Sequence, residues 1–184
     1  MQITLKKTLL YKEREEKRRK EFQEKIKSIA KDRLVFIDES GIDIFLSRKL
    51  GRSLRGDKIY GETSGRRYAR QSFIATKVGS RIIAPMTFEG TCHSKLFETW
   101  IEEFLTKELI PGQIVIMDNA AFHKSAKTRE LIEQSRCELL FFPPYSPDLN
   151  PIEKFWAWLK KKIQETISAF KTLKDALCHA FKNL

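Results

Sequence analysis

The segment Gln113–Asp118, "QIVIMD", is a short run of branched apolar residues that ends in an acid. Such a run predicts a strand that is buried on both faces of a sheet. Residues Arg33–Asp38, "RLVFID", repeat this pattern, and Cys137–Phe142, "CELLFF", predict a third buried strand. Helical apolar spacing separates the last two strands at residues 124–134. Because very apolar strands alternate with helices, we predict an α/β fold: a mixed sheet flanked by helices on both faces.

The remaining segments predict elements that extend this sheet or cover it. Residues 12–31, rich in Lys, Glu and Arg, predict a leading helix, and residues 70–90 predict a hairpin that turns at Gly79-Ser80. Residues 41–68 are rich in Gly and basic residues and predict a cationic, loop-rich insertion. Two more helices are predicted after residue 150. Helical spacing marks a buried stripe between the hairpin and the second strand at Phe97, Trp100, Ile101, Phe104 and Leu105.

Composition and charge narrow the class of protein. With 184 residues and 41% hydrophobic residues, the chain predicts one globular core, and no apolar run is long enough to cross a membrane. The net charge of +11 comes from basic flanks and a basic insertion around a carboxylate-rich centre. Basic segments of this kind favour a polyanionic partner, although they also occur as solvated faces. The three cysteines are far apart and predict neither a disulfide framework nor a zinc site.

Three acids are candidates for one metal site. Asp38 and Asp118 each end a predicted buried strand, and ligands gather at the carboxyl ends of strands in α/β sheets. Glu153 follows the third strand, but with Asn150 as N-cap and Pro151 as the first helical residue it also fits a capping box. If the three carboxylates converge, they suit Mg²⁺ or Mn²⁺ and two-metal phosphoryl transfer.

Three motifs carry a resemblance to a known family. They are "FIDESG" (Phe36–Gly41), "IVIMDNAAFHKS" (Ile114–Ser125) and "PPYSPDLNPIEKFWAWLK" (Pro143–Lys160). Together they resemble the signature blocks of the mariner-type superfamily of DDE transposases, in its bacterial insertion-sequence branch. The likeness runs from about residue 20 to residue 184, and the 34 residues between Asp118 and Glu153 are the spacing typical of that branch.

The resemblance implies a ribonuclease H-like fold and a catalytic triad of Asp38, Asp118 and Glu153 that binds two Mg²⁺ or Mn²⁺ ions. It implies cleavage of double-stranded DNA at transposon ends, strand transfer into target DNA, and a homodimer on the DNA. Asn119 is expected to contact the metal ligands rather than the metal itself. His123 is expected to do the same, to contact a phosphate, or to be a hydrogen-bonded structural residue. Further DNA contacts are expected at Arg52, Arg55, Lys124, Lys160 and Lys161.

The resemblance also sets the expected domain organisation. Residues 1–32 are interpreted as a basic linker helix, and residues 33–184 as the ribonuclease H-like catalytic domain. Family members usually begin with helix-turn-helix modules, which we expect to be lost here or encoded as a separate subunit. Two alternatives stay open: a catalytically inactive DNA-binding remnant, and another nuclease of the same fold. The protein is expected in the bacterial cytoplasm, associated with the nucleoid.

Overall fold

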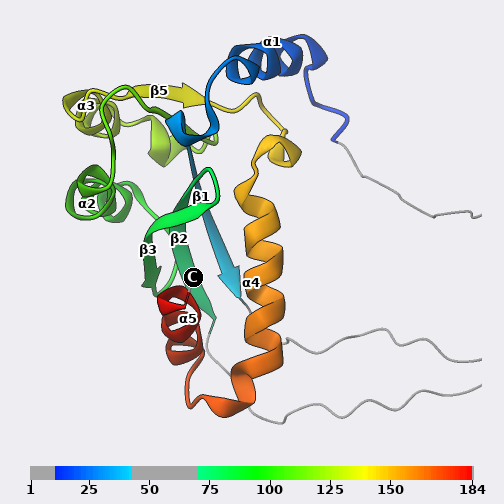
Figure 1. Ribbon diagram of the computed structural model, residues 1–184, viewed down its shortest axis with the longest axis vertical. Helices are drawn as coiled ribbons and strands as arrows, with labels where there is room; N and C mark the ends of the chain where they lie inside the picture. The colour runs from blue at the N-terminus through cyan, green and yellow to red at the C-terminus, as the bar shows by residue number, and fades with distance from the viewer. Residues whose placement is uncertain (1–10, 43–69, 184) are drawn as a thin grey trace, which may run out of the picture.

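The computed structural model describes residues 11–42 and 70–183, which form a five-stranded sheet covered by helices (Figure 1). The strand order is β3-β2-β1-β4-β5. The strands are β1 (Leu34–Ile42), β2 (Gln71–Val78), β3 (Arg81–Phe88), β4 (Ile114–Met117) and β5 (Glu138–Phe141). Strands β1, β4 and β5 run parallel, whereas β2 pairs antiparallel with both β1 and β3. The predicted mixed sheet is therefore confirmed, including the hairpin that turns at residues 79–80.

Helices cover both faces of this sheet. Side chains that alternate along β1 and β4, such as Val35 and Val115, pack against α2 (Ser94–Glu103) and α3 (Ala126–Gln134). The opposite face packs against α4 (Ile152–Thr166), α5 (Leu173–Lys182) and α1 (Glu16–Lys27). Short 3₁₀ turns lie at Lys31–Arg33, Leu105–Lys107, Ala121–Lys124, Pro147–Leu149 and Ile167–Ala169. None of the described helices is long and apolar enough to cross a bilayer.

Strand β1 is longer than its sequence predicts, which corrects the position of Asp38. The expected strand ended at Asp38, but β1 continues to Ile42. The reason is that β2 pairs with β1 as far as Ile42, while the parallel pairing with β4 ends at Phe36. Asp38 therefore lies within a strand, beside the point where its parallel neighbour has already ended.

Two burial predictions are wrong. Strand β5 is partly exposed, because it is the edge strand and has β4 on one side only. Phe104, expected in the buried stripe, is 46% exposed, since α2 ends at Glu103 and the chain tightens into a 3₁₀ turn; Leu105 in that turn is buried as predicted.

Helix α1 packs on the sheet through Phe22, whose ring lies 5.4 Å from that of Phe142. Arg19, buried in the same helix, makes two hydrogen bonds to Asp148 in the loop before α4. The helix predicted within residues 12–31 is confirmed, while the proposed domain boundary after residue 32 stays a prediction. Most of the cationic insertion, residues 43–69, lies outside the described residues.

Candidate active site

The three acids line one cavity of about 520 Å³. Asp38 comes from β1, Asp118 follows the last residue of β4, and Glu153 lies in the first turn of α4. Because β1 and β4 are parallel neighbours, both aspartates reach the same end of the sheet. The loop 143–147 and Tyr11 complete much of the wall.

Asp38 is held by a hydrogen bond and perturbed by its surroundings. The Nε1–H of Trp156, a buried residue of α4, donates to Asp38 Oδ2 over 2.9 Å. Burial, and after it the negative charge of Glu153, raise the pKa of Asp38 to about 7, even though the bond from Trp156 acts to lower it. Near neutral pH, Asp38 therefore exchanges readily between its protonated and charged forms.

Asp118 is held by His123, which also binds Glu39. His123 is 1% exposed; its Nδ1 lies 2.6 Å from Asp118 Oδ1 and its Nε2 lies 2.9 Å from Glu39 Oε1. Burial alone would lower the pKa of His123, but the bonds to both carboxylates raise it to about 9. Both ring nitrogens therefore carry protons at neutral pH and donate to the two acids.

The pKa of Asp118 is lowered, whereas those of Asp38 and His123 are raised. Burial alone would raise it, but the bond from His123 and the Ala120 N–H, 2.9 Å from Asp118 Oδ1, outweigh burial and lower it. Because His123 is buried, it does not fit the expected direct contact with a phosphate. Its position fits the other expected role, that of holding Asp118 from behind. The imidazole fixes which oxygen of Asp118 is occupied and which is free to face the cavity.

Glu153 does not form the capping box that its sequence position allowed. Asn150 lies just before α4, and its Oδ1 accepts from Ile152 N, the first N–H of the helix, over 3.3 Å. The N–H of Asn150 that a capping box would use donates instead to Pro147 O over 2.9 Å. The carboxylate of Glu153 is exposed and lines the cavity.

Of the other predicted site residues that the structure describes, Asn119 lines this cavity and the three lysines do not. Asn119 lines it and donates from Nδ2 to the carbonyl of Phe142, which joins the ends of β4 and β5. Exposed Lys124 lies over the Phe141 ring, 5.8 Å from its centroid. Lys160 lines a neighbouring cavity with Glu39 and Arg70, and Lys161 lies 3.9 Å from Glu165.

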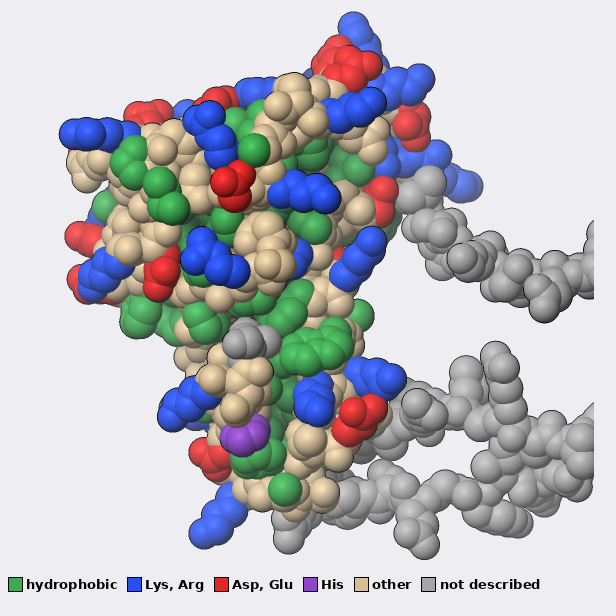
Figure 2. Space-filling view, in the orientation of Figure 1, with side chains coloured by type: hydrophobic (Ala, Val, Ile, Leu, Met, Phe, Trp, Pro, Cys, Tyr) green, Lys and Arg blue, Asp and Glu red, His purple; other side chains and the backbone are tan. Residues whose placement is uncertain are grey.

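The DNA contacts expected of the basic residues stay predictions. Arg52 and Arg55 lie outside the described residues. Figure 2 shows Lys and Arg side chains mixed with Asp and Glu over the visible face, rather than collected in one basic patch.

The carboxylates share a cavity without closing on one point. Across residues 11–42 and 70–183, no group of three His, Cys, Asp or Glu side chains is arranged to hold a single ion.

Sequence reasoning missed two residues that position the acids. Glu39 stands next to Asp38 in the strand, so strand alternation could have placed it on the opposite face, toward His123. Trp156 is three residues after Glu153 and therefore lies on nearly the same side of α4. Helix spacing in the sequence could thus have placed it near the acids.

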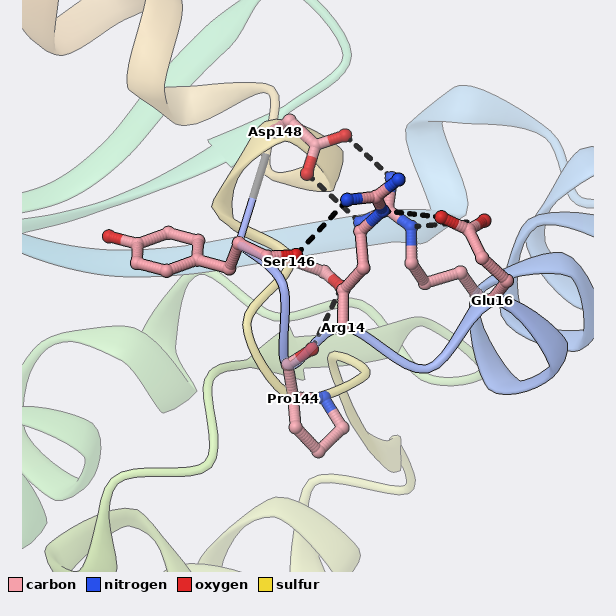
Figure 3. A network of polar contacts seen from close by, with 7 residues as sticks. Arg14, Glu16, Pro144, Ser146 and Asp148 are labelled. Carbon is pink, nitrogen blue, oxygen red and sulfur yellow. Dashed lines mark hydrogen bonds and ion pairs between the residues drawn. The ribbon is translucent and has the colours of Figure 1, made fainter. Parts of the chain in front are cut away.

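The loop that forms the cavity wall is fixed by polar contacts (Figure 3). Ser146 Oγ donates to Pro144 O over 3.0 Å, and Asp148 accepts both bonds from the Arg19 guanidinium, at 3.0 and 2.7 Å. Near the same loop, Arg14 forms an ion pair with Glu16 at the start of α1.

Known proteins are similar to this chain in sequence and in fold. Residues 33–175 match the family described as DDE superfamily endonuclease. Two transposases of Caenorhabditis elegans are similar: that of transposable element Tc3, 36% identical over 70 residues, and that of Tc1, 31% identical over 91 residues. These matches cover 36% and 50% of this chain but only 21% and 33% of the relatives' own length.

The structural neighbours confirm the ribonuclease H-like fold. The Mos1 transposase in its paired-end complex with the left transposon end has a TM-score of 0.68 at 18% identity, covering 88% of this chain and 53% of that one. The catalytic core domain of BIV integrase has a TM-score of 0.56 at 12% identity, covering 83% of each chain. With more than three quarters of its sequence matched by one family, the chain belongs to the DDE superfamily endonucleases.

Proposed function

We propose that this chain carries the catalytic domain of a mariner-type transposase of the bacterial insertion-sequence branch, which cleaves DNA at transposon ends and joins those ends to target DNA. The observation that carries the proposal is the convergence of Asp38, Asp118 and Glu153 on one cavity from three separate elements. The similarity to the Tc1 and Tc3 transposases supports it. A similar protein of Sinorhizobium fredii, 32% identical over 71 residues, supports the bacterial branch.

The same three acids are proposed to hold two Mg²⁺ or Mn²⁺ ions. The donors are all carboxylate oxygens, which these hard cations prefer. Their crowding fits a cation as well, because the pKa of Asp38 is raised to about 7 by burial and by Glu153, and a bound cation would offset both. When bound, such ions activate a water or 3′-hydroxyl and neutralise the phosphate. Mos1 structures described with Mn and with Mg agree with this choice of metals.

The side chains around the acids prepare them for this role. Trp156 occupies Asp38 Oδ2 and His123 occupies Asp118 Oδ1, so the proposed ions would bind the other oxygen of each aspartate. Glu39 on the far side of His123 keeps the imidazole in place. The reaction needs positioning and charge neutralisation more than a protein nucleophile, which matches a site built of fixed carboxylates.

Double-stranded DNA is the proposed partner, both as transposon end and as target. Neighbours described as paired-end and strand transfer complexes of Mos1 support this choice. The same proposal includes a homodimer on DNA, a separately encoded or frameshift-fused helix-turn-helix subunit, and a bacterial cytoplasmic location. The inactive-remnant alternative is less favoured, because the three acids and the residues that position them are all in place.

Metal-dependent nicking of DNA tests the proposal. Purified protein is incubated with supercoiled plasmid carrying the element's ends and Mn²⁺, and compared with Asp118→Asn. Glu165→Gln, an exposed glutamate on the same helix as Glu153, serves as the matched control. We expect nicking by wild type and by the control but not by Asp118→Asn. Wild type that fails to nick while binding DNA would favour the inactive remnant, and better cleavage of RNA hybrids than of DNA would favour the other nuclease.

A further inference from the structure

Part of the wall of the cavity that the three carboxylates line is apolar and aromatic. Beyond its polar residues, this cavity is lined by Tyr11, Phe142, Pro143, Pro144, Tyr145 and Pro147. The Phe and Pro side chains supply no ligand to a metal ion or phosphate, and the ring faces of the two tyrosines are apolar as well. An apolar and aromatic wall suits the flat face of a nucleobase instead.

Tyr145 occupies a position that local stability does not explain. Its backbone is in the left-handed region with φ 53°, which costs a residue other than glycine about 1 kcal/mol or more. Its side chain is 55% exposed, so burial offsets little of that cost. A strained backbone that displays an exposed aromatic ring in a cavity indicates a role in binding.

Tyr11 places a second ring beside the first. The two ring centroids lie 5.8 Å apart with planes tilted by 42°, and Tyr11 is 54% exposed. The rings come from segments more than a hundred residues apart in sequence, yet both line the same cavity as the acids. Together they form an accessible aromatic surface in the cavity that the three acids line.

The loop under Tyr145 is fixed on both sides, as Figure 3 shows for its neighbours. Ser146 Oγ binds Pro144 O over 3.0 Å, and Leu149 N binds Ser146 O over 3.1 Å. The bidentate pair of Arg19 and Asp148 ties the loop to α1, the helix that follows Tyr11. A ring on such a loop is presented in a set orientation, which stacking requires.

We propose that Tyr145, with Tyr11 beside it, is a stacking platform for an unpaired nucleobase next to the phosphate held at Asp38, Asp118 and Glu153. The inference rests on the proposed function and deepens it, because it names the part of the substrate that the apolar wall recognises. A base can reach the rings only when it has left the duplex, as at an opened end or a flipped position. Stacking accepts any base, so the platform supports opened DNA without reading its sequence.

The test compares two probes in a binding assay that needs no catalysis. Both are duplexes with a short 3′ overhang, one of thymidines and one of abasic spacers, and Ca²⁺ replaces Mg²⁺. Fluorescence anisotropy gives their dissociation constants. The wild type is expected to bind the thymidine overhang about tenfold more tightly.

Matched variants separate stacking from other roles. Tyr145→Phe keeps the ring and should keep the preference, whereas Tyr145→Leu should lose it with an unchanged melting temperature, since the side chain is exposed. Trp158→Leu removes another exposed aromatic, 48% exposed and lining a different cavity, and should keep the preference.

Equal binding of the two probes by wild type, or a preference that survives in Tyr145→Leu, would overturn the platform. That result would leave the proposed function intact if plasmid nicking still depends on Asp118. Failure of wild type to bind either probe would instead overturn the proposed function, and the platform with it.

Discussion

Replacing Asp38 by asparagine should stabilise the metal-free protein at alkaline pH. The pKa of Asp38 is raised from 3.8 to about 7 by burial and by Glu153. Between these two values the folded state keeps a proton that the unfolded state has lost, so the free energy of unfolding falls as pH rises. The stability is fully present below pH 4 and is lost as pH passes through about 7.

The size of this effect follows from the shift. Each pH unit in the window changes the free energy of unfolding by about 1.4 kcal/mol. From pH 5 to pH 8 the wild type should therefore lose about 2–3 kcal/mol that Asp38→Asn does not lose. Asn can still accept the hydrogen bond of Trp156, so the packing around the site is preserved.

The assay is urea unfolding in EDTA at pH 5 and pH 8, followed by tryptophan fluorescence. Glu153→Gln is the control, because removing the charge that raises the pKa of Asp38 should shrink the pH dependence without abolishing it. Adding Mn²⁺ at pH 8 should reverse the order, since only the intact carboxylate gains stability from the bound ion. If Asp38→Asn and the wild type change equally from pH 5 to pH 8, Asp38 does not have the raised pKa and the reasoning fails.

Other predictions concern the residues that position the acids. Trp156→Phe keeps an aromatic ring against that of Phe73, whose centroid lies 5.0 Å away, but removes the hydrogen bond to Asp38. It should lower the free energy of unfolding by about 1 kcal/mol and raise the Mn²⁺ concentration needed for half-maximal nicking severalfold. An unchanged Mn²⁺ requirement would show that the bond has no role in metal binding. His123→Gln, in EDTA, should be destabilised most below pH 6.5 and progressively less as pH rises through about 9, because the imidazole of wild type adds this stability only while it keeps its proton. Thermal melts from pH 6 to pH 10 measure this, and a destabilisation that does not vary with pH would contradict the charged His123.

The sequence predicts the sheet well because its central strands are continuous apolar runs. Strand β4 and the acid after it need no distant information, since burial on both faces leaves a local signature in "IVIM". The end of β1 could not be predicted in this way. Its last four residues, Glu39–Ile42, are held by pairing with β2, a partner about thirty residues away.

The site shows the same division between local and distant information. The three acids stand in recognisable motifs, but the bond between His123 and Glu39 joins residues 84 positions apart. The contact of Tyr11 with Tyr145 likewise depends on how α1 lies on the sheet. Pairwise contacts of this kind arise from packing and leave no periodic pattern in either segment.

Metal binding by wild type and by Glu153→Gln tests the central claim most directly. Isothermal titration with Mn²⁺ at pH 8, with Glu165→Gln as the matched control, measures it without requiring DNA or turnover. We predict saturable binding by wild type and by the control, and binding at least tenfold weaker by Glu153→Gln with a metal-free melting temperature no lower than that of wild type, because an amide is a much poorer ligand than a carboxylate. Equal Mn²⁺ affinity in wild type and Glu153→Gln would contradict the assignment of Asp38, Asp118 and Glu153 as one metal site.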